Sequence, residues 1–181
     1  QFSVGILAEE GSELPVFDNV LADIGDEQSI SGSLSTFSAH MRNISEIIEK
    51  CTEKSLVVLD EPGTGTDPEE GAALTMAVFD TLIERKTIFL ATTHQGILKN
   101  YAAGKEEIQN ASVKYDSETY RPEYLLVYGL PGESFGIDIA MKTGLDSIVI
   151  ERARKYIGSE KVNINELLRE ISLKQIEIRK R

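Results

Sequence analysis

Short apolar runs alternate with longer amphipathic stretches along the first hundred residues. Residues 56–59 form an apolar run rich in β-branched side chains, and residues 87–91 form a second one. Runs this short, each ending in a polar loop, are typical of buried strands in a parallel sheet. Between them, residues 68–85 are predicted to form a helix, with Asp67 at the N-cap and a proline at the first helical position. This succession predicts a right-handed crossover between two parallel strands.

Similar patterns predict further elements on both sides of this unit. Upstream, we expect a strand over residues 16–24 and a helix over residues 36–51. Downstream, the pattern predicts two antiparallel strands followed by two helices, over residues 111–116, 123–128, 135–142 and 147–157. The predicted fold class is therefore α/β, with a mainly parallel sheet flanked by helices.

The end of the chain has a different pattern. Gly158 and Ser159 interrupt the helical periodicity, and apolar residues then recur at alternating steps of four and three, at Ile164, Leu168, Ile171 and Ile178 with Gln175 between the last two. This spacing fits the seam of a short coiled coil, and it fits equally well a helix on the surface of its own domain. We therefore predict a main domain over residues 1–158 and a helical extension over residues 159–181.

Composition narrows the class of protein. Hydrophobic residues make up 41% of the 181-residue chain and charged residues 27%, as in ordinary globular proteins, and no apolar run is long enough to cross a bilayer. The chain starts without an initiator Met or a basic segment, so we expect a piece of a larger protein rather than a signal peptide. Cys51 has no second cysteine to pair with, which favours the cytoplasm. The net charge of −11 argues against this piece gripping nucleic acid by itself.

Candidate catalytic and metal-binding residues come at the carboxyl ends of the two central predicted strands. Asp60 comes at the carboxyl end of the first strand, where α/β sheets hold ligands, and could hold Mg²⁺ through water. Glu61, the next residue, could orient or deprotonate an attacking water. Alone, these two carboxylates are a weak signal, and they favour an ordinary acidic loop after a strand. His94 lies at the tip of the neighbouring predicted strand and could donate a hydrogen bond to a phosphate, so the three residues together favour a catalytic site.

These residues resemble the ABC ATPases, a superfamily of P-loop NTPases. Residues 56–62 are similar to the Walker B motif with its catalytic glutamate, and residues 63–67 are similar to the D-loop, which contacts the other subunit. The resemblance implies that Asp60 is the metal ligand, that Glu61 and His94 are catalytic, and that Asp67 belongs to the nucleotide-binding set. His94 would be the switch histidine, in contact with the γ-phosphate.

A second resemblance narrows the family to MutS. The Leu-Ser-Gly-Gly signature of transporter-type ABC proteins is absent, and Ser35-Thr36-Phe37 followed by Met41 is similar to the MutS signature instead. Ser35 and Thr36 would begin a helix, whose N-terminus favours an anion, and would bind the ATP held by the partner subunit. Residues 66–74, 110–113, 118–124, 129–134 and 150–154 resemble the type 2 branch, whose members carry a C-terminal Smr nuclease domain. Gln95 departs from the family pattern, and His40 is expected to be structural.

The resemblance implies ATP and Mg²⁺ as cofactors and a homodimer with composite ATPase sites. The parent would be a DNA-binding ATPase in recombination control, DNA repair or ribosome rescue, contacting branched DNA or the ribosome through regions outside this sequence, and cutting DNA through an Smr domain also outside it. The Walker A loop is not in the sequence and is expected just before Gln1, so the chain alone should be inactive. Two alternatives stay open: the C-terminal lobe of an SMC-like ABC head, and a non-catalytic interaction module.

Overall fold

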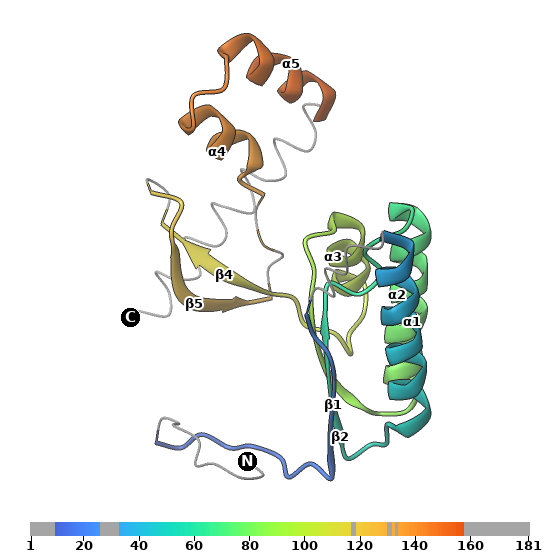
Figure 1. Cartoon of the computed structure of the whole chain (residues 1–181). Coiled ribbons are helices and arrows are strands. Elements are labelled where there is room, and N and C mark those ends of the chain that lie inside the picture. Colours follow the sequence, from blue (N-terminus) through green and yellow to red (C-terminus); the bar gives the residue numbers. More distant parts are fainter. Residues whose placement is uncertain (1–9, 26–32, 117–118, 130–131, 133, 158–181) are drawn as a thin grey trace. The chain divides into compact units, whose positions relative to one another are not determined.

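The computed structural model describes residues 10–25, 33–116, 119–129, 132 and 134–157. Its elements follow in the order β1 (Asn19–Asp23), α1 (Ser33–Lys50), β2 (Ser55–Asp60), α2 (Pro68–Glu84), β3 (Ile88–Thr92), α3 (Gly96–Ala103), β4 (Ala111–Tyr115), β5 (Pro122–Tyr128), α4 (Gly136–Lys142) and α5 (Ser147–Ile157) (Figure 1). The chain divides into two compact units, Gln1–Leu98 and Lys99–Arg181. Within the described ranges, no helix is long and apolar enough to span a membrane.

The first unit contains a three-stranded parallel sheet in the order β1-β2-β3. The parallel arrangement and the helical connections between the strands confirm the prediction of a mixed α/β fold. The strand predicted over residues 16–24 is shorter in the structure, because its pairing with β2 begins where Asn19 lies opposite Ser55. β2 is the central strand, so its carboxyl end is flanked by the ends of β1 and β3.

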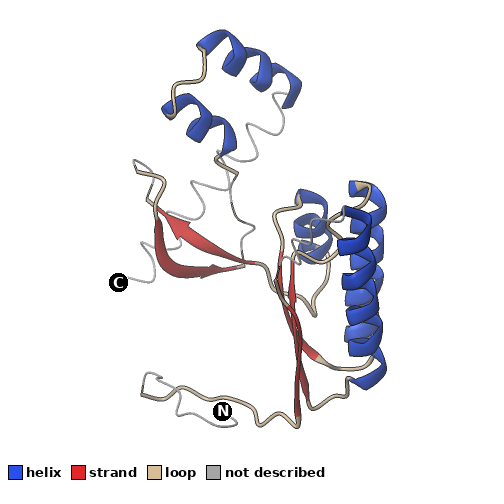
Figure 2. Ribbon diagram, in the orientation of Figure 1, coloured by secondary structure: helices blue, strands red, loops and turns tan. Residues whose placement is uncertain are grey.

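Two helices cover one face of this sheet. α1 and α2 lie side by side along the strands (Figure 2). Alternate residues of β2 point toward them, and Ser55, Val57 and Leu59 are almost completely buried, as expected for period-two alternation. The ring of Phe79 from α2 stacks on Phe89 of β3 at 5.1 Å between centroids, which joins the helix layer to the edge strand.

Helix α2 begins as its sequence predicts. Oδ1 of Asp67 accepts hydrogen bonds from the backbone N–H groups of Glu69 (3.0 Å) and Glu70 (3.1 Å), which satisfies two of the free donors of the first turn. The helix ends at Glu84, and Lys86 adopts a positive φ of 56° just beyond it. The capped start fixes where the loop after β2 must join the helix.

The second unit contains the antiparallel pair β4-β5, as predicted, and the helices α4 and α5, which contact each other. α3 was not predicted, because it has only eight residues, begins at Gly96 and lacks an acidic first turn. It crosses the boundary between the units, with Leu98 and Ala102 buried one turn apart. The predicted extension over residues 159–181 lies outside the described residues, so its division from the main domain stays a prediction.

Candidate functional site

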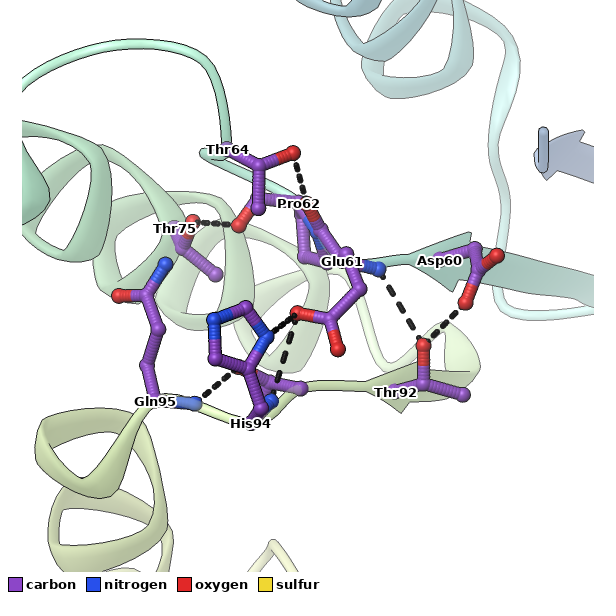
Figure 3. A network of polar contacts seen from close by, with 9 residues as sticks. Asp60, Glu61, Pro62, Thr64, Thr75, Thr92, His94 and Gln95 are labelled. Carbon is purple, nitrogen blue, oxygen red and sulfur yellow. Dashed lines mark hydrogen bonds and ion pairs between the residues drawn. The ribbon is translucent and has the colours of Figure 1, made fainter. Parts of the chain in front are cut away.

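The structure brings three of the predicted site residues together at the carboxyl end of the parallel sheet (Figure 3). Asp60 is the last residue of β2 and pairs in register with Thr92, the last residue of β3. The backbone N–H of Glu61 continues this pairing and donates to the carbonyl of Thr92 at 3.2 Å. His94 follows β3 by two residues, so the sheet itself places its ring beside Glu61.

The side chains of Glu61 and His94 are in direct contact. Nδ1 of His94 lies 2.8 Å from Oε2 of Glu61, and the backbone N–H of His94 donates to the same oxygen at 3.3 Å. An ionised carboxylate only accepts hydrogen bonds, so the proton of this contact must be on Nδ1. In the described part of the chain, Nε2 of His94 and Oε1 of Glu61 have no hydrogen-bond partner. The pair therefore leaves one basic oxygen and one ring nitrogen for a ligand.

The backbone at Glu61 is in the left-handed region, with φ of 48°, and Gly63 follows with φ of 82°. Such a conformation costs energy for a residue other than glycine and persists only where the surroundings enforce it. Here the hydroxyl and the backbone N–H of Thr64 both donate to the carbonyl of Glu61, at 2.9 and 3.3 Å. Thr75 of α2 contacts the next part of the turn, with its hydroxyl 2.9 Å from the carbonyl of Pro62 and 2.8 Å from that of Gly71. The turn that carries Glu61 is thus fixed to the helix behind it.

The same turn depends on two glycines that touch. A Cβ placed on Gly71 would lie 2.1 Å from the carbonyl oxygen of Gly63, and a Cβ on Gly63 would lie 2.4 Å from that of Gly71. Neither position has room for a side chain, so the loop lies directly on the first turns of α2. Sequence analysis missed Thr75 and Gly71. The only available signal was a glycine inside a predicted helix, which often marks close backbone approach.

Asp60 is suited to a hydrated magnesium ion. The hydroxyl of Thr92 donates to Oδ1 of Asp60, and Oδ2 has no partner among the described residues. Mg²⁺ typically keeps several waters and takes one or two protein carboxylates together with substrate phosphates. A single carboxylate with one free oxygen fits that requirement.

The remaining predicted residues lie at helix starts. Ser35 and Thr36 are in the first turn of α1, which begins three residues earlier than predicted, at Ser33. Asp67 caps α2, and its Oδ1 is used in that cap. The nucleotide-binding roles of these three residues stay predictions.

A second polar cluster was not predicted. Asp23, the last residue of β1, accepts hydrogen bonds through its two carboxylate oxygens from side chains of α1. Nδ1 of His40 lies 2.7 Å from Oδ2, and the amide of Asn43 donates to Oδ1 at 3.1 Å. Both Asp23 and His40 are buried. The cluster ties β1 to α1, in agreement with the structural role expected for His40.

Comparison with known proteins places the chain in one family. The family model of MutS domain V matches residues 3–160. A protein named Endonuclease MutS2 from Clostridium botulinum (strain ATCC 19397 / Type A) is 50% identical over 171 residues, which are 94% of this chain and 22% of that relative. Endonuclease MutS2 of Alkaliphilus oremlandii (strain OhILAs) is 47% identical over the same shares of the two chains. The protein of that name from Staphylococcus saprophyticus is 49% identical over 159 residues, 88% of this chain and 20% of the relative.

These matches confirm the resemblance to the type 2 branch that the motifs indicated. The chain spans about a fifth of the length of the curated relatives it matches. From the family model and from an identity near one half, it follows that the chain belongs to the MutS family and is its domain V region.

Proposed function

We propose that this chain forms the hydrolytic part of an ATP-hydrolysing domain of the P-loop, ABC type. The observation that carries the proposal is the contact between Glu61 and His94 directly beside Asp60, at the carboxyl edge of a parallel sheet. Ligands of open α/β sheets bind at this edge. A metal-binding carboxylate, a candidate base and a hydrogen-bonding histidine side by side suit phosphoryl transfer to water.

Each side chain has a distinct part in this proposal. Asp60 would hold a hydrated Mg²⁺, and the ion would supply positive charge that stabilises the phosphates. Glu61 receives a proton from the attacking water on Oε1, the oxygen that His94 leaves free. His94 orients the carboxylate through Nδ1, and a ring protonated on both nitrogens also donates from Nε2 to the γ-phosphate.

The proposal extends to a shared site in a homodimer. Ser35 and Thr36 lie in the first turn of α1, and a helix N-terminus is a favourable place for a phosphate. In this arrangement they complete the ATP site of the partner subunit, and Asp67 belongs to the loop that contacts that subunit. The phosphate-cradling loop is supplied by residues outside this sequence. The parent is a cytoplasmic DNA-binding ATPase acting in recombination control, DNA repair or ribosome rescue, and the name of its relatives supports an additional endonuclease activity.

The decisive experiment is the replacement Glu61→Gln in the full-length protein. The amide keeps the size of the side chain and removes the base, so ATP turnover should fall by about 10²- to 10⁴-fold, the usual contribution of a general base. ATP affinity, measured by equilibrium binding, should stay unchanged. Glu84→Gln is the matched control, because Glu84 is exposed at the far end of α2. Normal turnover by the Glu61→Gln protein would contradict the proposal.

A further inference from the structure

Among the residues that the structure describes, Thr92 is the one whose side chain contacts both acidic residues of the candidate site. It ends β3, directly opposite Asp60 in the register of the sheet. Its hydroxyl bonds to Oδ1 of Asp60, and the backbone N–H of Glu61 lies 3.2 Å from the same hydroxyl oxygen. Figure 3 shows this oxygen between the two residues. No motif in the sequence singled out Thr92, because its contacts reach residues more than thirty positions away.

The two bonds are compatible with one hydroxyl. A threonine hydroxyl has one hydrogen and two acceptor lone pairs. Its hydrogen goes to Asp60, because an ionised carboxylate only accepts, and a lone pair faces the N–H of Glu61. The direction of the hydroxyl is restricted, since β-branched side chains in strands have few allowed χ1 angles. The sheet backbone therefore fixes where the hydroxyl points, and the hydroxyl in turn fixes the carboxylate of Asp60.

The hydroxyl is dispensable for pairing the strands. The N–H of Glu61 also donates to the backbone carbonyl of Thr92 at 3.2 Å, and this bond does not involve the side chain. Loss of the hydroxyl thus leaves the β2–β3 connection in place. What is lost is the only hydrogen bond recorded for Asp60's carboxylate among the described residues. Loss of the hydroxyl should therefore change the orientation of the Asp60 carboxylate and leave the fold intact.

We propose that Thr92 is a positioning residue that engages one carboxylate oxygen of Asp60 and so leaves the other for binding the metal. This inference rests on the proposed function of Asp60. Thr92 touches no reacting atom and acts through its neighbour. Without the hydroxyl, the carboxylate samples other rotamers, and binding of the metal must then select the productive one.

The test measures metal binding directly in the full-length protein. Mn²⁺ replaces Mg²⁺ as the probe, because bound and free Mn²⁺ are distinguished by electron paramagnetic resonance, and a non-hydrolysable ATP analogue fills the nucleotide site. Thr92→Val keeps the shape and removes the hydroxyl. It should raise the Kd for Mn²⁺ by about three- to tenfold, the range for loss of one ordinary intramolecular hydrogen bond. Thr92→Ser keeps the hydroxyl, so its Kd for Mn²⁺ should stay within about twofold of the Kd of the unmodified protein.

Two further variants make the outcome decisive. Thr81→Val removes a threonine hydroxyl that donates to a backbone carbonyl within α2, and it should leave Mn²⁺ binding unchanged. Asp60→Asn removes the ligand itself. If Thr92→Val fails to fold by circular dichroism, Thr92→Ala takes its place, with the same expected loss.

The possible failures are distinguishable. If Asp60→Asn weakens Mn²⁺ binding but Thr92→Val does not, the inference on Thr92 is wrong and the proposed role of Asp60 stands. If Thr92→Ser loses as much affinity as Thr92→Val, the methyl group matters rather than the hydroxyl, and the inference is again overturned. If Asp60→Asn binds Mn²⁺ normally, the proposed function of Asp60 itself fails.

Discussion

Two histidine–carboxylate pairs of almost equal length lie at the same edge of the sheet, and they differ in burial. Nδ1 of His40 is 2.7 Å from Asp23, and Nδ1 of His94 is 2.8 Å from Glu61. The side chains of the first pair are 11% and 3% exposed, and those of the second are 75% and 35% exposed. A contact distance therefore does not distinguish the structural pair from the pair proposed to be catalytic, whereas exposure to solvent does.

The surroundings explain the different parts the two pairs can play. Asp23 is satisfied on both oxygens, by His40 and Asn43, and lies between a strand and a helix. A buried polar group without its partner is costly, so this cluster holds β1 and α1 together. Glu61 has one oxygen without a partner among the described residues, and the ring of its partner His94 is 75% exposed. The exposed pair is therefore far more accessible to a ligand than the buried pair.

The largest expected effect on stability comes from opening the buried pair. Asp23→Ala leaves the ring of His40 and the amide of Asn43 without their acceptor, at a cost of about 3 kcal/mol. Hydrogen exchange of the full-length protein, followed by mass spectrometry, should show faster exchange in peptides of β1 and α1. Asp18→Ala, at an exposed position just before β1, is the control and should exchange normally. If β1 and α1 of the Asp23→Ala protein exchanged hydrogen as slowly as in the unmodified protein, the buried pair would have no greater structural role than the exposed one.

Features set by residues close together in the sequence could be predicted, whereas contacts between residues far apart in the sequence could not. The strands and helices around β2 and the cap at Asp67 follow from local patterns, and Asp60, Glu61 and His94 follow from their place at strand ends. The contacts that position them do not, because Thr92 meets Asp60 only through the register of β2 and β3. The pair of Asp23 and His40 likewise joins a strand to a helix across a loop. Short α3, without a cap signal, was missed for a local reason.

The second prediction concerns the backbone beneath the exposed pair. Gly71→Ala places a methyl group against the carbonyl of Gly63 and should destabilise the loop by about 1–3 kcal/mol, the usual cost of overpacking. The same change should displace Glu61 and lower ATP turnover of the full-length protein. Gly136→Ala is the control, because a Cβ there meets nothing within 4 Å. Normal turnover and normal exchange in the loop would mean that the exposed pair needs no rigid support.

The third prediction compares the coupling within each pair. In a double-mutant cycle with Glu61→Gln and His94→Ala, we expect a coupling energy for stability below about 1 kcal/mol, as for other exposed pairs. The corresponding cycle with Asp23→Asn and His40→Ala should give a clearly larger value, because both side chains are almost completely buried. The coupling is obtained from local exchange rates of the full-length protein. Equal coupling in the two cycles would show that burial is not the deciding property.

The smallest expected effect comes from a third pair, whose two side chains are 60% and 65% exposed. On α1, Nζ of Lys50 donates to Oε2 of Glu46 at 2.9 Å, in the favourable order with the acid one turn earlier. The hydrogen bond from Lys50, and then its charge, lowers the pKa of Glu46, and the same contact raises the pKa of Lys50.

The sign of the pH dependence follows from these directions. A lowered carboxyl pKa stabilises the fold above the pKa of the unfolded chain, and this contribution is lost as the pH falls through the folded value. A raised lysine pKa stabilises below its unfolded value, and this contribution is lost as the pH rises through the folded one. The pair is therefore at full strength at neutral pH. Even there, solvent screens it, and Glu46→Gln should leave exchange of α1 unchanged within error, in low and high salt alike. If the Glu46→Gln protein instead showed hydrogen exchange in α1 as fast as the Asp23→Ala protein, an exposed pair would contribute as much to stability as a buried one. That result would contradict the ranking of the three pairs by burial.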